Sequence, residues 1–159
     1  MINTYNSPKR KPSIWVTGVS KLMAGETQCS WASWKKAHFN GLNKIPSNFP
    51  QSTWVLNHTH LINEITSELI SENKKYTIEN QNFFSLQGKS GVMLSGKPDI
   101  ISYHDNEATV IDAKTGSPKA SDKIQILIYL FAMSKQIDFA GLDLSGVVVY
   151  SDHRVEIPF

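Results

Sequence analysis

The chain has 159 residues, of which 40% are hydrophobic and 19% are charged, and its formal net charge is +2 at neutral pH. This composition is ordinary for a globular protein, and the length suits one domain with a single core. So mild a basic excess does not by itself identify a nucleic-acid-binding protein. We therefore expect one domain spanning residues 1–159, whose function must be sought in local patterns.

The cysteine content and the apolar runs exclude two other classes of protein. Cys29 is the only cysteine, which rules out an internal disulfide. The longest strictly apolar run, Ile126–Met133, has eight residues, whereas a membrane-spanning helix needs about twenty. The first residues also lack the apolar run of a signal peptide. We expect an intracellular, cytoplasmic protein with no membrane partner.

Residues 1–13 combine Asn, Ser and Pro with three consecutive basic residues and show no periodicity. Such a stretch predicts a flexible basic arm. The triplet Lys9-Arg10-Lys11 and the pairs Lys35-Lys36 and Lys74-Lys75 could contact phosphates. A solvated surface charge is the simpler explanation for each cluster taken alone.

Residues 14–50 are expected to form a helical N-terminal region that ends in a loop. Short helices are predicted at Val16–Met23 and at Thr27–Phe39, the second beginning at its threonine cap. Trp31 and Trp34 lie three apart and therefore share one side of the second helix. We favour packing of these indoles onto the core over stacking on nucleic-acid bases.

A longer helix is predicted from about residue 51 to Ser71. Its apolar residues recur at three- and four-residue spacing, and His58 falls within that stripe. A lone histidine on an apolar face is usually a hydrogen-bonded core residue. His60 faces a more polar side of the same helix.

The remaining sequence predicts strands and one further helix, so that residues 51–159 form the core. The helix begins after the break at Thr115–Pro118 and continues to about residue 136, because it is apolar on nearly every side. Gln125 and Tyr129 lie four apart and share one of its faces. Strands are expected where β-branched and aromatic residues lie between turn signals, at 75–86, from 92, at 100–103, 108–111, 146–150 and 155–159.

One predicted hairpin brings two carboxylates together. Its strands, Ile100–Tyr103 and Ala108–Ile111, are separated by a polar cluster that suits a turn. If Asp105-Asn106 forms a two-residue loop, Asp99 faces Asp112 directly across the hairpin.

Two facing aspartates in an apolar hairpin repel each other and therefore need a cation. Side chains alternate along a strand, so Lys114 projects on the same face as Asp112, while Ala113 points the other way. Hard cations such as Mg²⁺ prefer oxygen ligands and keep several waters. This face therefore suits metal-assisted hydrolysis of a phosphodiester.

These residues resemble the PD-(D/E)xK nucleases. Pro98-Asp99, twelve intervening residues and then Asp112-Ala113-Lys114 match the core motif of that family. Gln125-x-x-x-Tyr129 matches the additional motif of its RecB-like exonuclease branch. The resemblance covers about residues 51–150. It implies, in agreement with the order of predicted elements, an α/β fold with a restriction-endonuclease-like core, in which helices flank a mixed central β-sheet.

The resemblance also implies roles for the motif residues. Lys114 would orient the attacking water and steady the developing negative charge. RecB-like nucleases carry a metal-binding histidine on a helix before the first strand, followed three residues on by an aliphatic residue, as Leu61 follows His58. We therefore favour His58 over His60 as a ligand. Mg²⁺ or Mn²⁺ would be held by His58, Asp99, Asp112 and the Ala113 backbone carbonyl, and DNA would be positioned by Gln125 and Tyr129.

The N-terminal region faintly resembles the stretch of CRISPR-associated exonucleases in which four cysteines hold an iron–sulfur cluster. Cys29 has no cysteine companion, and one thiolate cannot supply four ligands. We expect no iron–sulfur cluster and a packed free thiol. The function expected is a sequence-nonspecific, Mg²⁺- or Mn²⁺-dependent DNA exonuclease that acts on single-stranded or frayed ends. The alternative is a catalytically inactive nucleic-acid-binding or assembly module with the same fold.

Overall fold

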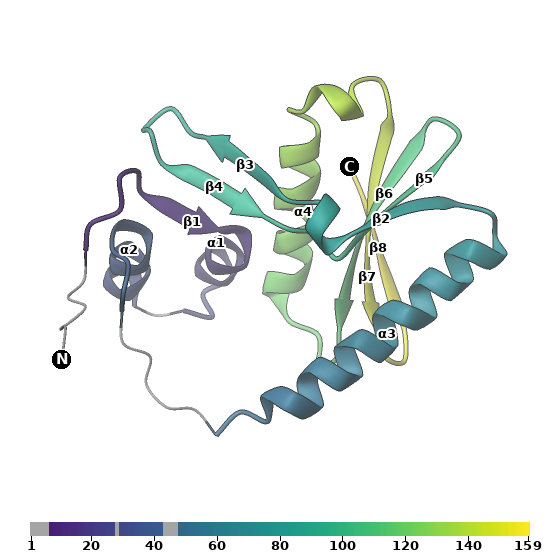
Figure 1. The fold of residues 1–159 in the computed structure, drawn as a ribbon, viewed down its shortest axis with the longest axis horizontal. Helices are drawn as coiled ribbons and strands as arrows, with labels where there is room; N and C mark the ends of the chain where they lie inside the picture. The colour runs from purple at the N-terminus through teal and green to yellow at the C-terminus, as the bar shows by residue number, and fades with distance from the viewer. Residues whose placement is uncertain (1–6, 28, 43–47) are drawn as a thin grey trace.

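The computed structural model describes residues 7–27, 29–42 and 48–159 (Figure 1). Eight strands, four α-helices and two short 3₁₀ helices lie within the described residues. In chain order they are β1 (Ser13–Trp15), α1 (Val16–Met23), α2 (Ser30–His38), α3 (Gln51–Ser71), β2 (Lys75–Ile78), η1 (Glu79–Gln81), β3 (Phe84–Gln87), β4 (Met93–Gly96), β5 (Ile100–His104), β6 (Glu107–Lys114), α4 (Ala120–Met133), η2 (Ile137–Phe139), β7 (Asp143–Tyr150) and β8 (Arg154–Pro158).

The larger sheet is mixed and has the strand order β2-β5-β6-β7-β8. Only β6 and β7 run parallel to each other; the other neighbours are antiparallel. A parallel pair needs a crossover connection, and α4 provides it. α4 packs on one face of the sheet and α3 crosses the other (Figure 1). The predicted mixed α/β fold with flanking helices is confirmed.

A second, three-stranded sheet has the order β1-β4-β3 and was not predicted. β1 pairs parallel with β4, and β3 pairs antiparallel with it. The N-terminal region is therefore joined to the middle of the chain by backbone hydrogen bonds. The described part of the expected flexible arm makes backbone contacts, since Pro8 bridges Phe39 and the Lys9 amide donates to the His38 carbonyl at 2.7 Å. Residues 1–6 of that arm lie outside the described residues.

Alternation along β6 divides its side chains between two cores. Ile111 and Ala113 pack under α3 with Leu61, whereas Val110 packs under α4. α4 comes very close to β7, because a Cβ at Gly146 would overlap the Ile126 side chain. Glycine at this position thus allows the helix to lie directly on the strand.

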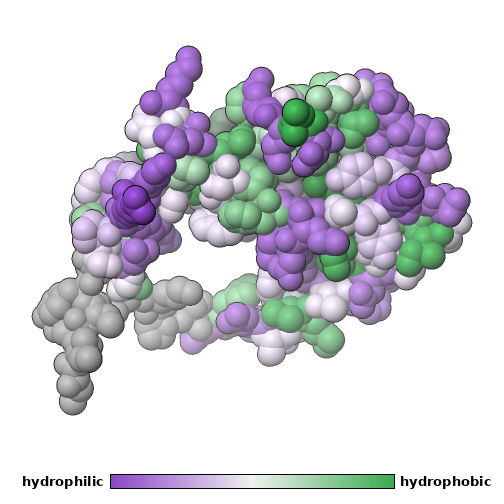
Figure 2. All heavy atoms as spheres, turned by 45° about the horizontal axis from the view of Figure 1, so that its top comes forward, coloured by the Kyte–Doolittle hydropathy of each residue, from purple (hydrophilic) through white to green (hydrophobic). Residues whose placement is uncertain are grey.

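Only the C-terminal half of α3 rests on the sheet. Its buried residues are Leu61, Ile65 and Leu69, spaced by one helical turn, while Trp54 and Val55 are 43% and 45% exposed. The predicted apolar stripe therefore continues beyond the sheet that covers it. In the space-filling view an open gap lies between part of the lower edge of the molecule and the body above it (Figure 2).

The indoles of α2 contradict the expectation that they pack on the core. Trp31 and Trp34 are 63% and 51% exposed, because α2 turns Ala37 rather than its tryptophans inward. The helix begins later than predicted, with Cys29 as its cap and its Sγ accepting from the Ala32 amide at 3.4 Å. Cys29 is exposed, so the expectation of a packed thiol is wrong. Among the described helices, none combines the length and the hydropathy needed to cross a bilayer.

Candidate active site

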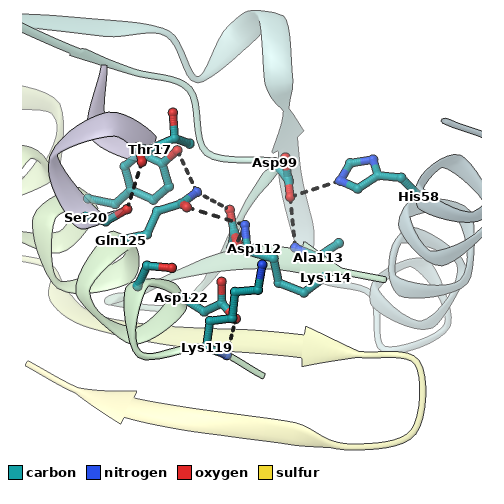
Figure 3. Close-up of polar contacts among 12 residues, drawn as sticks. Thr17, Ser20, His58, Asp99, Asp112, Ala113, Lys114, Lys119, Asp122 and Gln125 are labelled. Carbon is teal, nitrogen blue, oxygen red and sulfur yellow. Dashed lines mark hydrogen bonds and ion pairs between the residues drawn. The ribbon is translucent and has the colours of Figure 1, made fainter. Parts of the chain in front are cut away.

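A cleft of about 580 Å³ opens where β6 ends and α4 begins. One of its walls comes from α1 and the start of α4, the opposite wall from the N-terminal half of α3, and the floor from the end of the β5–β6 hairpin. In open α/β sheets, ligands commonly bind outside the carboxyl ends of the strands. The motif residues of the sequence meet here (Figure 3).

The hairpin has the predicted register up to its last pair. Ile101 faces Val110 and Tyr103 faces Ala108, around a turn in which Asp105 has a φ of 49°. The ladder ends one pair before the expected one.

The prediction that Asp99 pairs with Asp112 across the ladder is therefore wrong, because the last pair is Ile100 with Ile111. The Asp99 carboxylate oxygen Oδ2 instead accepts a hydrogen bond of 2.8 Å from the backbone amide of Ala113. The residue before it is Pro98, which has no N–H to extend the ladder. A side chain thus takes the place of a backbone pair and fixes Asp99 at the end of β6.

Asp112 lies at the base of the cleft and is only 2% exposed. Its Oδ1 accepts a hydrogen bond of 2.9 Å from Gln125, and its Oδ2 lies 2.5 Å from the Lys114 ammonium. Burial, reinforced by the nearby charge of Asp99, raises the pKa of Asp112 to about 6 despite the lysine. The negative charge of a carboxylate in this position is therefore only partly balanced by Lys114.

Lys114 points from β6 into the same space, as the strand alternation predicted. Its ammonium lies 3.4 Å from the Gln125 carbonyl oxygen as well as beside Asp112. Burial acts to lower its pKa, but the charges of Asp112 and Asp99 outweigh that effect and raise it. The amine therefore stays protonated at neutral pH.

The structure brings His58 to the site and leaves His60 outside. His58 Nε2 lies 3.4 Å from Asp99 Oδ2, and this hydrogen bond raises the pKa of His58 despite its partial burial. His60 instead pairs with Glu64 on the exposed side of α3. Figure 3 shows Asp99 between His58 and the backbone of Ala113.

Gln125 and Tyr129 are both nearly buried and line the back of the cleft. The Gln125 amide donates to Asp112 and, at 3.2 Å, to the Tyr129 hydroxyl, which in turn donates to the Lys97 carbonyl at 3.4 Å. Burial raises the pKa of Tyr129, so it remains a neutral donor. Together they orient Asp112. The predicted contact of these two residues with DNA stays a prediction.

The sequence pattern missed several residues of the cleft. Asp122 is buried in the first turn of α4, where it accepts from the Tyr150 hydroxyl and from the Lys119 amide. Its place three residues after Lys119 was the available signal, since an acidic residue there caps a helix. Trp54 and Lys21 were missed because only the tertiary fold brings α1 and α3 together across the cleft.

The donor atoms suit a hard divalent cation. Asp112 Oδ2 is fully buried and lies 2.5 Å from the Lys114 ammonium, but it receives no well-aligned hydrogen bond from the described residues, so a lone pair of this oxygen remains for a cation. In the described part of the chain, no three His, Cys, Asp or Glu side chains converge as they would around a fully protein-coordinated ion. The site thus fits an ion such as Mg²⁺, which commonly binds through one or two carboxylates and keeps several waters.

The family model for the PD-(D/E)XK nuclease superfamily matches residues 21–154. The chain belongs to the PD-(D/E)XK nuclease superfamily. Its members are nucleases that generally use divalent metal ions such as Mg²⁺ or Mn²⁺, so the substrate class is nucleic acid. The RecB-like branch and its QxxxY motif stay a prediction.

A solved structure described as "Crystal structure of SSO0001" is similar in fold. Its TM-score is 0.51 at 20% sequence identity, over 96% of this chain and 71% of that chain. At this identity the likeness concerns the fold alone. A search of curated proteins found no match.

Proposed function

We propose that the protein is a Mg²⁺- or Mn²⁺-dependent DNA exonuclease that cleaves without sequence preference, acts on single-stranded or frayed ends, and serves DNA repair, recombination or phage DNA processing. One observation carries the proposal. A buried aspartate, Asp112, and a charged lysine, Lys114, lie 2.5 Å apart at the base of an open cleft, with a second carboxylate, Asp99, fixed beside them.

Each residue has a separate task in this proposal. Asp99, Asp112, the Ala113 carbonyl and His58 are the proposed metal ligands; to bind the ion, His58 would exchange its hydrogen bond from Nε2 to Asp99 for a bond to the metal. The ion would act as a Lewis acid on the scissile phosphate. Lys114 orients the attacking water and stabilises the negative charge that develops on the phosphate. Gln125 keeps Asp112 in place.

The proposed lack of sequence preference rests on the elements present in the described part of the chain. No helix-turn-helix or zinc module is left over among them to read base edges. Binding would then come mainly from phosphate contacts, which position a strand without specifying its sequence. Increasing salt should weaken such binding steeply.

The test uses one DNA sequence in two forms, a linear single strand and a covalently closed single-stranded circle. With Mg²⁺ or Mn²⁺ the linear strand should be degraded to short products and the circle left intact, and chelation should stop the reaction. Efficient cutting of the circle would contradict an exonuclease. Binding of both forms without any cleavage would favour the inactive binding module, against which the intact carboxylates and lysine argue.

A further inference from the structure

An aromatic stack forms part of the cleft wall contributed by α3. The Trp54 ring lies one helical turn before His58 and stacks on it, with 5.1 Å between ring centroids and 26° between planes. Phe49 stands at an angle to the indole, with ring centroids 6.4 Å apart. His58 in turn bonds Asp99. The indole is therefore separated from the carboxylates only by one imidazole ring.

Packing of the fold does not explain why a tryptophan occupies this position. Trp54 is 43% exposed, and the sheet that buries Leu61 on the same helix does not extend this far. Leaving so large an apolar surface in water forgoes the stabilisation that burial would give. An indole that is accessible inside a cleft is available to a ligand.

Two lysines lie on the wall opposite Trp54, near the carboxylate of Glu26. Lys21, in the last turn of α1, and Lys119, just before α4, are both exposed and line the cleft. A groove that combines lysines for the backbone with an aromatic ring for the bases is the arrangement used to bind single strands. Its volume is about 580 Å³, which is within the range of small-ligand sites.

We propose that Trp54 is a stacking platform for one unpaired nucleobase next to the cleaved linkage, while Lys21 and Lys119 contact the phosphates of that strand. The inference deepens the proposed function and rests on it. A base inside a duplex has no free face to offer, so this platform selects single strands and frayed ends. Trp54 would thereby determine specificity.

The competing explanation is that Trp54 acts only through His58, by holding its ring. The two explanations differ when the base itself is removed. An abasic residue has no ring to stack but keeps its phosphates, so it should weaken binding only when the platform is present. A double-mutant cycle that combines a substitution of Trp54 with removal of the base isolates the contact between the two.

The first experiment measures kcat/KM with Mn²⁺ on single strands that carry one abasic residue at the first, second or third position from an end. In the unchanged protein, one position should cost about 5- to 150-fold, the range found for loss of one stacked base. In Trp54→Ala the intact strand should lose a similar factor, and the abasic penalty should nearly vanish. Trp54→Phe keeps an aromatic face and is the control for misfolding of the alanine variant. It should restore most of the rate on the intact strand and most of the abasic penalty.

The second experiment needs no hydrolysis. Fluorescence anisotropy in EDTA measures the Kd of a labelled single strand and of the matching duplex. Trp54→Ala should raise the Kd for the single strand about 5- to 150-fold and change that for the duplex little. Trp31→Ala, which removes an exposed indole outside the cleft, should change neither. A protein that binds in this way but does not cleave would refute the proposed nuclease and leave the platform intact.

Three results would overturn the platform. One is an abasic penalty of the same size in Trp54→Ala as in the unchanged protein, which would assign Trp54 to positioning His58. Another is the lack of any position-dependent abasic penalty in the unchanged protein. The third is an unchanged Kd for single strands in Trp54→Ala.

Discussion

At the scale of single residues, the site is governed by the burial of Asp112. An ionised carboxylate that is 2% exposed and lies near Asp99 is stabilised only in part by Lys114. Asp112→Asn should abolish hydrolysis, because it removes a proposed ligand, yet leave the fold intact. At pH 8 without metal, Tm should stay close to that of the parent protein, because the relieved repulsion from Asp99 and the lost ion pair with Lys114 act in opposite directions.

Activity assays and thermal melts with and without Mg²⁺ test this change. Asp105→Asn is the matched control, because Asp105 lies on the exposed turn of the same hairpin and asparagine tolerates its positive φ. The control should keep both activity and Tm. Normal cleavage by Asp112→Asn would refute the assignment of the site.

Lys114 can be separated from metal binding by substitution. Lys114→Ala should lower the rate at saturating metal by about 10²-fold or more, as the loss of one preorganised charge does elsewhere. Calorimetry should show that metal still binds, because the lysine is not a ligand and its removal frees Asp112 Oδ2. Lys135→Ala, at the far end of the α4 region, should leave both properties unchanged. A collapse of metal affinity in Lys114→Ala would show that the roles are wrongly divided.

At the scale of elements, the contact between α4 and β7 holds the site together. Gly146→Ala adds a methyl group where the Ile126 side chain already lies. Overpacking of this kind costs about 1–3 kcal/mol, so Tm should fall by several degrees. Activity should fall as well, because Gln125 precedes Ile126 on α4 and must reach Asp112.

Gly18→Ala in α1 is the matched control for the same added atom. A Cβ there meets only Ile14, at 3.9 Å, and alanine in a helix interior is favoured over glycine by about 0.5–1 kcal/mol. Chemical denaturation should therefore show Gly18→Ala as stable as the parent protein or more so. Equal stability of Gly146→Ala and the parent would contradict the close packing.

The elements that the sequence predicted well are those whose signals are local. The α1 bounds, the α3 bounds and the β5–β6 register follow from periodicity and from a two-residue turn. β1 could not be foreseen, because three residues carry no periodicity and their partner strand lies far along the chain. The tryptophans of α2 were misjudged because spacing shows which side chains share a side, not which side is covered.

At the scale of the whole molecule, the expected lack of an iron–sulfur cluster can be tested together with the exposure of Cys29. Purified protein should be colourless and free of stoichiometric iron and labile sulfide, since the chain has one cysteine. Because that thiol is exposed, it should react fully with Ellman's reagent without denaturant. Stoichiometric iron and sulfide in a monomer or an oligomer would contradict the expected lack of a cluster. A thiol that reacts only after unfolding would contradict the exposure of Cys29.

For the site, the motif residues could be predicted and their surroundings could not. The hairpin and the strand alternation predicted Asp112 and Lys114 on one face, as the structure has them. The bond from the Ala113 amide to Asp99 depends on where the ladder stops. The wall that carries Trp54 depends on how far α3 projects beyond the sheet, which no local pattern contains.

The parallel pairing of β1 with β4 has a consequence for the order of folding. These strands lie about eighty residues apart in the chain, whereas the β5–β6 hairpin closes over two residues. Closing a long loop is entropically more costly and slower than closing a short one. The carboxylates should therefore find their places early, and Lys21, on the helix that follows β1, should arrive last. Pulsed hydrogen exchange during refolding should show protection in β5 and β6 before β1 and β4; simultaneous protection would mean that the cleft is assembled in one step.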